Sequence, residues 1–174
     1  MYNYKNILLS ALVFLAFTSY GCEAGDSPAS NIGPQVNPKE EITFFITSDV
    51  HYLSPGLTDG KKAFEKFMQF NDAKHLECID EIMEAFVSEI KQEKPDALII
   101  CGDLTNNGEQ ISHLDIKNKL EKIKEEGISV YIIPGNHDIL NPWARCFDCT
   151  EQHPVKTICD EEFAEIYGDF GYSD

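Results

Sequence analysis

Three short apolar runs alternate with two longer segments in which apolar residues recur every three or four positions. The apolar runs are residues 42–47, 97–101 and 129–133. Uninterrupted runs of this length are typical of strands buried on both faces of a parallel sheet. The intervening spacing predicts helices over residues 73–94, ended by Pro95, and over residues 113–123, capped by Gly127. Strands that alternate with helices predict an α/β fold built of parallel βαβ units.

The segments that remain after residue 41 show neither a long apolar run nor helical spacing over a comparable length. Residues 48–59 and 141–157 are predicted to be irregular. A short last helix is expected over residues 161–167, with Asp160 as its N-cap and Gly168 beyond its end.

The first 21 residues have the features of a signal peptide. Lys5 precedes an apolar run at residues 7–17, which suits a signal-peptide core and is short for a membrane span. The following Ser-Tyr-Gly-Cys sequence is similar to a bacterial lipoprotein signal, which implies lipidation of Cys22. Secretion with cleavage near Ala24 and an uncleaved anchor are the alternatives.

Residues 22–40 are rich in Gly, Ser, Pro and Asn and predict a flexible linker. We therefore expect an exported domain over residues 41–174. It would be tethered to a membrane by the lipid anchor on the cell surface or periplasmic side, or else secreted.

The charge of the chain limits its partners. Lysine and arginine number 14 against 30 acidic residues, which gives a formal net charge of −16. Nonspecific nucleic-acid binding depends on cationic residues that meet phosphate, so it is not expected. A small phosphorylated substrate remains compatible with this charge, because bound cations can reverse the sign of the field locally.

Polar side chains follow each of the three predicted strands. Asp49 and His51 follow the first, Asp103 follows the second, and Asn136 and His137 follow the third. In an open α/β sheet the carboxyl ends of parallel strands form the ligand-binding rim. Oxygen and imidazole ligands suit Mn, Fe, Zn or Mg. Each residue alone would fit a strand-end cap, but the joint pattern favours a metal site.

In their order, the motifs Asp49-Val50-His51, Gly102-Asp103 and Gly135-Asn136-His137-Asp138 resemble the calcineurin-like metallophosphoesterase superfamily. The resemblance implies two divalent or trivalent metal ions and hydrolysis of phosphomonoester or phosphodiester bonds by a metal-bound hydroxide.

The same resemblance implies a role for each site residue. Asp49 and His51 would hold the first ion, Asp103 would bridge, and Asn136 would hold the second. His137 would protonate the leaving group or stabilise the phosphoryl oxygens.

Details of the motifs bear on the subfamily. Protein phosphatases of the superfamily carry Gly-Asp-x-x-Asp-Arg-Gly, whereas residues 102–108 lack the second aspartate and the arginine. The third motif ends in Asp138 rather than glutamate. The chain is therefore more similar to phosphodiesterase-type members that act on small molecules.

Complete members of the superfamily have later ligands that this sequence lacks. They carry a Gly-His-x-His pair and a second sheet, whereas only His153 follows the third motif here. We therefore expect the βαβαβ half of an αββα sandwich, a fragment with weak activity or none. The alternative is a non-catalytic, surface-anchored binding module of the same fold. A flavodoxin-like domain would instead need a glycine-rich loop after the first strand, and residues 48–51 do not form one.

Three late cysteines allow several interpretations. Cys146, Cys149 and Cys159 surround His153, so a disulfide, free thiols or a zinc site are all open. Asp138 is expected to be structural rather than a ligand. His75 and His113 lie in helical patterns, which favours solvent exposure or core packing.

Overall fold

The computed structural model describes residues 41–70 and 74–172. The predicted signal peptide, Cys22 and the linker lie outside the described residues. In chain order the elements, with η for a 3-10 helix, are β1 (Phe44–Thr47), η2 (Pro55–Leu57), α1 (Lys62–Met68), η3 (Leu76–Cys78), α2 (Ile79–Glu93), β2 (Ala97–Cys101), α3 (Gln110–Lys124), β3 (Ser129–Ile133), β4 (Arg145–Asp148), β5 (Glu151–Pro154), α4 (Asp160–Ile166) and η4 (Gly168–Phe170).

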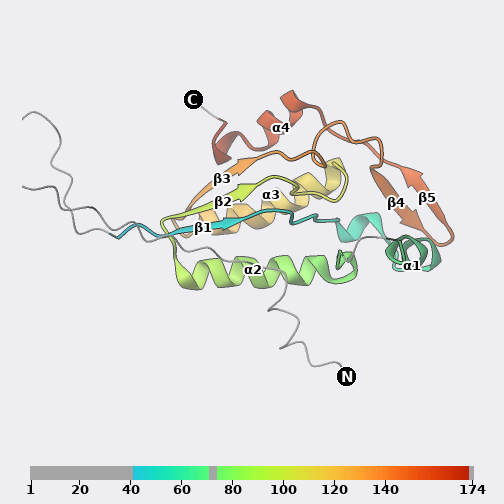
Figure 1. The fold of residues 1–174 in the computed structure, drawn as a ribbon, viewed down its shortest axis with the longest axis horizontal. Helices are drawn as coiled ribbons and strands as arrows, with labels where there is room; N and C mark the ends of the chain where they lie inside the picture. The colour runs from blue at the N-terminus through green and yellow to red at the C-terminus, as the bar shows by residue number, and fades with distance from the viewer. Residues whose placement is uncertain (1–40, 71–73, 173–174) are drawn as a thin grey trace, which may run out of the picture.

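A parallel sheet with strand order β1-β2-β3 is the centre of the fold (Figure 1). Its register aligns Thr47 with Ile100 and Ile100 with Ile132, so the three carboxyl ends lie side by side. Helix α2 connects β1 to β2, and α3 connects β2 to β3. The predicted α/β fold with parallel βαβ units is confirmed. Within the described residues no helix is long and apolar enough to cross a membrane.

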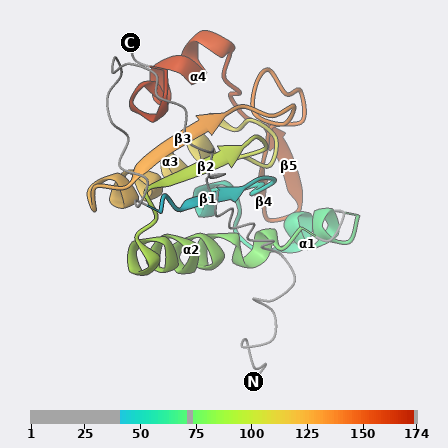
Figure 2. The same ribbon diagram turned by 60° about the vertical axis from the view of Figure 1, so that its left-hand side comes forward.

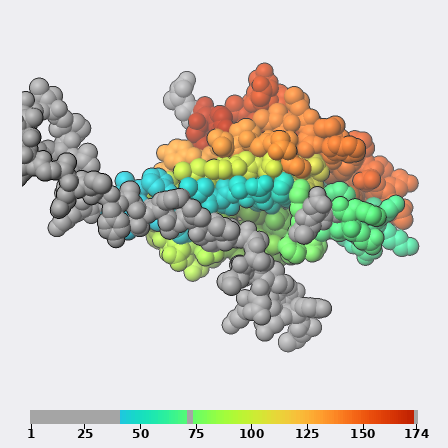
Figure 3. Space-filling view, viewed as in Figure 1, coloured from blue at the N-terminus to red at the C-terminus, as the bar shows by residue number. Residues whose placement is uncertain are grey.

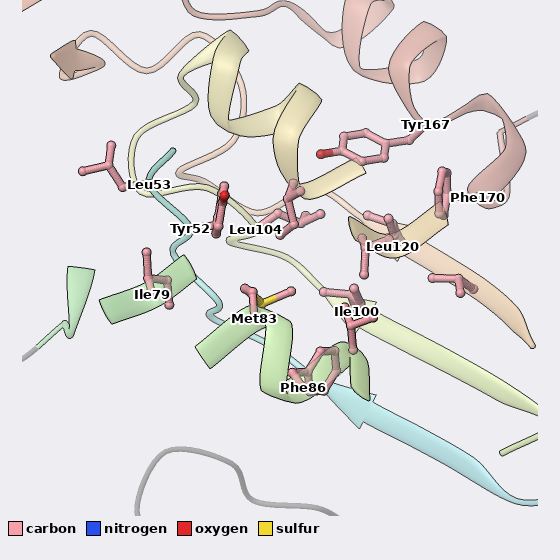
Figure 4. Packing of buried hydrophobic residues seen from close by; sticks show 14 of the residues in the cluster. Tyr52, Leu53, Ile79, Met83, Phe86, Ile100, Leu104, Leu120, Tyr167 and Phe170 are labelled. Atoms are coloured by element: carbon pink, nitrogen blue, oxygen red, sulfur yellow. The ribbon is translucent and has the colours of Figure 1, made fainter. Parts of the chain in front are cut away.

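Among the described residues, helices cover one face of this sheet and leave the other open. Helices α2 and α3 contact each other against that face (Figure 2). Ile100, Met83, Phe86 and Leu120 pack there (Figure 4). On the opposite face Tyr131 is 51% exposed.

The prediction of strands buried on both faces is confirmed for the central strand β2, where Ala97, Leu98 and Ile100 are buried, and is wrong for β3. Strand β3 alternates between exposed and buried positions because one of its two faces is open among the described residues. Strand β1 forms an edge of the sheet and, in Figure 3, is visible at the surface between α2 and β2.

One helix and one hairpin were not predicted. Helix α1 lies in a stretch without a clear pattern, and β4 and β5 form an antiparallel hairpin where residues 141–157 were expected to be irregular. Phe147 of the hairpin packs against Phe64 and Phe67 of α1, with ring centroids 5.4 and 4.9 Å apart. Each element buries the apolar side chains of the other, and this contact is invisible in either segment alone.

Some helix ends also differ from expectation. Helix α2 begins at Ile79, after the short helix η3, rather than near residue 73, and Pro95 follows its left-handed C-cap, Lys94. Helix α4 starts at Asp160 because Cys159, not Asp160, is the N-cap: the Cys159 N–H donates to Glu162 at 3.0 Å.

Candidate metal centre

The first motif is held against the second by backbone hydrogen bonds that continue beyond β1. The Asp49 N–H donates to the Gly102 carbonyl at 3.2 Å, and the His51 N–H donates to the Asp103 carbonyl at 2.8 Å. Asp49, His51 and Asp103 all have left-handed backbones, with φ of 56°, 49° and 49°. This conformation is uncommon outside glycine and recurs at functional sites. It turns the chain so that the three side chains meet.

His51 lies at the centre of the group. Its Nε2 atom is 3.9 Å from Asp49 Oδ1 and 3.9 Å from Asp103 Oδ2. The rings of His51 and His137 meet edge to face, with centroids 4.8 Å apart. One ligand atom from each of His51, Asp103 and His137 lies within 4.8 Å of the other two. These distances show that four of the five predicted site residues lie together: Asp49, His51, Asp103 and His137.

These separations fit a bound cation. Ligand atoms at about 2.0–2.2 Å from one metal ion lie roughly 3–4 Å from one another. The distances from His51 to the two carboxylates are in that range and too long for hydrogen bonds. His51 Nδ1 is also buried without a hydrogen-bond partner among the described residues. The donor set, two carboxylates and two imidazoles, therefore suits a divalent metal.

The fifth predicted residue, Asn136, is exposed in the turn after β3. Its neighbour Gly135 lies against Asp103, and the backbone N–H of His137 donates to Asp103 Oδ1 at 2.9 Å. Asn136 therefore lies at the same edge of the sheet, on the side open to solvent.

His137 is oriented by a residue that the sequence did not single out. Its Nδ1 lies 2.7 Å from the backbone carbonyl of Asn106. A carbonyl oxygen only accepts hydrogen bonds, so Nδ1 carries the proton and Nε2 is left available. A backbone carbonyl leaves no mark in the side-chain sequence, which is why this contact was missed.

The charge state of His51 also suits metal binding. Burial lowers the pKa of His51, and the nearby cation of Lys74 and the His137 ring lower it further, against the raising effect of Asp103 and Asp49. The neutral imidazole is the form that binds a metal ion.

Asp138 is fully buried and holds the motifs together rather than facing the centre. Its carboxylate accepts the N–H groups of Leu104, Thr105 and Gly135 at 3.2, 2.9 and 2.8 Å, and the Thr105 hydroxyl at 2.9 Å. The preference for a structural role is confirmed.

The late cysteines lie outside the centre. Cys146, Cys149 and Cys159 are free thiols in the structure, so the disulfide interpretation is not supported by it. Cys149 forms an exposed group with Asp59 and Asp148, where backbone N–H donors from Cys149 and Lys61 lower the pKa of Asp59 to about 2.

The sequence profile for calcineurin-like phosphoesterases matches residues 42–173, which is most of the chain. The chain belongs to the calcineurin-like phosphoesterase family. This phosphoesterase matched none of the curated proteins with which it was compared. Membership indicates metal-dependent hydrolysis of phosphoesters, and the matched range contains all three strand-end motifs.

Proposed function

We propose that this calcineurin-like phosphoesterase hydrolyses phosphomonoester or phosphodiester bonds with a dinuclear metal centre. The observation that carries the proposal is the convergence of Asp49, His51, Asp103 and His137 from three strand ends. Asp49 and His51 would hold one ion, Asp103 would bridge, and Asn136 would hold the second. Bound divalent cations supply positive charge to phosphate oxygens and lower the pKa of water.

His137 would manage the proton of the leaving group. The Asn106 carbonyl fixes Nδ1 as a donor, which leaves Nε2 as the atom that binds or releases a proton. Holding the ring on Asn106 also limits its rotation, so that Nε2 keeps one position relative to His51 and Asp103.

We propose a small phosphorylated molecule as the substrate, with phosphodiesters favoured by the motif pattern. A cavity of about 220 Å³ adjoins the candidate centre and is lined by Asp49, His51 and Lys74 together with side chains of α2. The cavity accommodates a small organic group, and Lys74 adds one positive charge to a mostly apolar lining. The net charge of −16 disfavours nucleic acid as a partner.

The leader and linker support an exported location. We propose a lipid anchor at Cys22, with residues 22–40 as the tether, so that the domain acts at a membrane surface. Secretion without an anchor is the alternative that the leader sequence allows.

We also propose that the described domain is one half of a larger catalytic unit. The sheet face carrying Phe44, Tyr131 and Ile133 is open among the described residues, at 39%, 51% and 55% exposure. A second sheet over that face would bring further ligands to the centre. The same observation favours a second candidate, a non-catalytic tethered module that binds metal or phosphate without turnover.

Hydrolysis of bis-p-nitrophenyl phosphate with Mn²⁺ tests the proposal. We expect Mn²⁺-dependent release of nitrophenolate by the purified protein and a loss of more than about 100-fold in Asp103→Asn. The loss of a direct ligand should exceed the ~10–100-fold cost of losing an outer-shell partner. The matched control is Asp148→Asn, the same change in the exposed carboxylate group near Cys149.

The outcomes separate the two candidates. Activity that survives the double substitution of Asp49 and Asp103 would contradict the hydrolase. Binding of Mn²⁺ at these residues without turnover would support the tethered module instead.

A further inference from the structure

A buried hydrogen-bonded chain runs from the C-cap residue of helix α4 to the back of the candidate centre. It consists of Tyr167, His113 and the backbone carbonyl of Asp138, and both side chains are fully buried. The Tyr167 hydroxyl lies 3.0 Å from His113 Nδ1, and His113 Nε2 lies 2.9 Å from the Asp138 carbonyl oxygen. Three separate segments, α3, α4 and the turn after β3, are thereby joined behind the centre.

The direction of each hydrogen bond follows from its acceptor. The Asp138 carbonyl can only accept, so His113 Nε2 carries a proton. Burial lowers the pKa of His113 and raises that of Tyr167, so the ring is neutral and the phenol keeps its proton. In a neutral ring Nδ1 is then an acceptor, and the Tyr167 hydroxyl donates to it at 3.0 Å, with the His113 carbonyl as a more distant second acceptor at 3.3 Å. Tyr167 thus selects the tautomer of His113 that can hold Asp138.

Asp138 is the residue through which this chain reaches the centre. Its carboxylate accepts the N–H groups of Leu104, Thr105 and Gly135. Its carbonyl oxygen accepts from His113 Nε2 of α3, and the same nitrogen lies 3.4 Å from the Thr105 hydroxyl. Asp138 is therefore fixed through both its carboxylate and its backbone carbonyl, and the preceding residue, His137, donates its own N–H to Asp103.

We propose that Tyr167 and His113 are positioning residues for the metal centre, setting the turn that carries Asn136 and His137 through the Asp138 carbonyl. The inference rests on the proposed metal-dependent function. Neither side chain touches the centre, so their effect is on the placement of its ligands. Outer-shell hydrogen bonds of this kind change metal affinity by about 10–100-fold when removed.

Equilibrium binding of Mn²⁺ to the full chain, followed by electron paramagnetic resonance of the free ion, tests the proposal. Tyr167→Phe removes one oxygen and keeps the ring, and we expect the Kd for Mn²⁺ to rise about 10-fold or more. Tyr131→Phe removes the same atom from an exposed position on β3 and should leave the Kd unchanged.

A matched pair at His113 separates positioning from packing. The amide nitrogen of His113→Gln reaches the place of Nε2 and keeps the donor to Asp138, whereas the shorter His113→Asn loses it. We expect His113→Asn to weaken Mn²⁺ binding about as much as Tyr167→Phe, and His113→Gln to bind within about threefold of the unaltered protein. Amide hydrogen exchange at Gly135 should accelerate in the two weakened variants.

The results distinguish this inference from the proposed function. If the unaltered protein binds Mn²⁺ and Tyr167→Phe binds equally well, with unchanged exchange at Gly135, the positioning role is overturned and the metal centre stands. If His113→Gln weakens binding as much as His113→Asn, packing explains the effect and the inference is also overturned. If the unaltered protein binds no Mn²⁺, the proposed function falls, and the inference with it.

Discussion

At the scale of single residues, the closest approach in the centre is between Gly135 and Asp103. A Cβ atom added at Gly135 would lie 2.2 Å from Asp103 Oδ1 and 2.4 Å from the Asp103 backbone nitrogen. Gly102, with φ of +82°, lies next to the same glycine. The second and third motifs can therefore share one site only because a residue without a side chain separates them.

Gly135→Ala should therefore destabilise the protein and displace Asp103. Overpacking of a filled site typically costs about 1–3 kcal/mol of unfolding free energy. We expect a loss of that size in urea denaturation, together with weaker Mn²⁺ binding. Gly168→Ala is the control, because a Cβ there meets no atom within 4 Å. Equal stability of the two variants would show that the close approach has no energetic consequence.

At the scale of secondary-structure elements, the edge strand β1 and the open sheet face are the exposed features. Phe44 on β1 is 39% exposed, and the sheet has no strand paired beyond β1 among the described residues. Unpaired apolar edges favour association between chains, and natural proteins often place lysine there to prevent it.

Phe44→Lys should therefore reduce self-association of the protein. Sedimentation velocity over a range of concentrations should show a smaller rise in average mass than for the unaltered protein. Leu114→Lys, at a residue of α3 that is 44% exposed, makes the same change away from the sheet and should have little effect. If the two lysine variants associate to the same extent, charge alone explains the change and the sheet face is not involved.

The elements also show which structure the sequence could predict. The apolar runs and helical spacing predicted β1 to β3, α2 and α3, because the signal for each lies in the pattern of its own residues. The hairpin β4–β5 has exposed, polar β5 residues and is stabilised through Phe147 by α1. Such long-range contacts leave no local period, so neither α1 nor the hairpin was predicted.

The candidate site divides in the same way. Its side chains could be predicted from the sequence because they follow strand ends, and parallel strands end at one rim of the sheet. The contacts that support these side chains could not be predicted from the sequence. The Asn106 carbonyl that orients His137, and the link from Tyr167 through His113 to Asp138, depend on backbone atoms and on segments far apart in the chain.

At the scale of the whole molecule, the strong negative charge makes site-specific measurement essential. With a net charge of −16, exposed carboxylates attract divalent cations over much of the surface. Among the residues that the structure describes, two other groups of acidic and cysteine side chains, one around Cys149 and one around Cys159, each place three possible ligand atoms within 4.8 Å of one another. Binding stoichiometry alone therefore does not identify the centre.

The most direct measurement is paramagnetic broadening of backbone amide signals by substoichiometric Mn²⁺ in the ¹⁵N-labelled protein. The signals of Asp49, Asp103 and His137 should broaden together, before those of Cys149 and Cys159, and Asp103→Asn should abolish this pattern. Broadening that begins at the hairpin, or that affects the three strand ends independently of one another, would contradict the account of a shared metal centre.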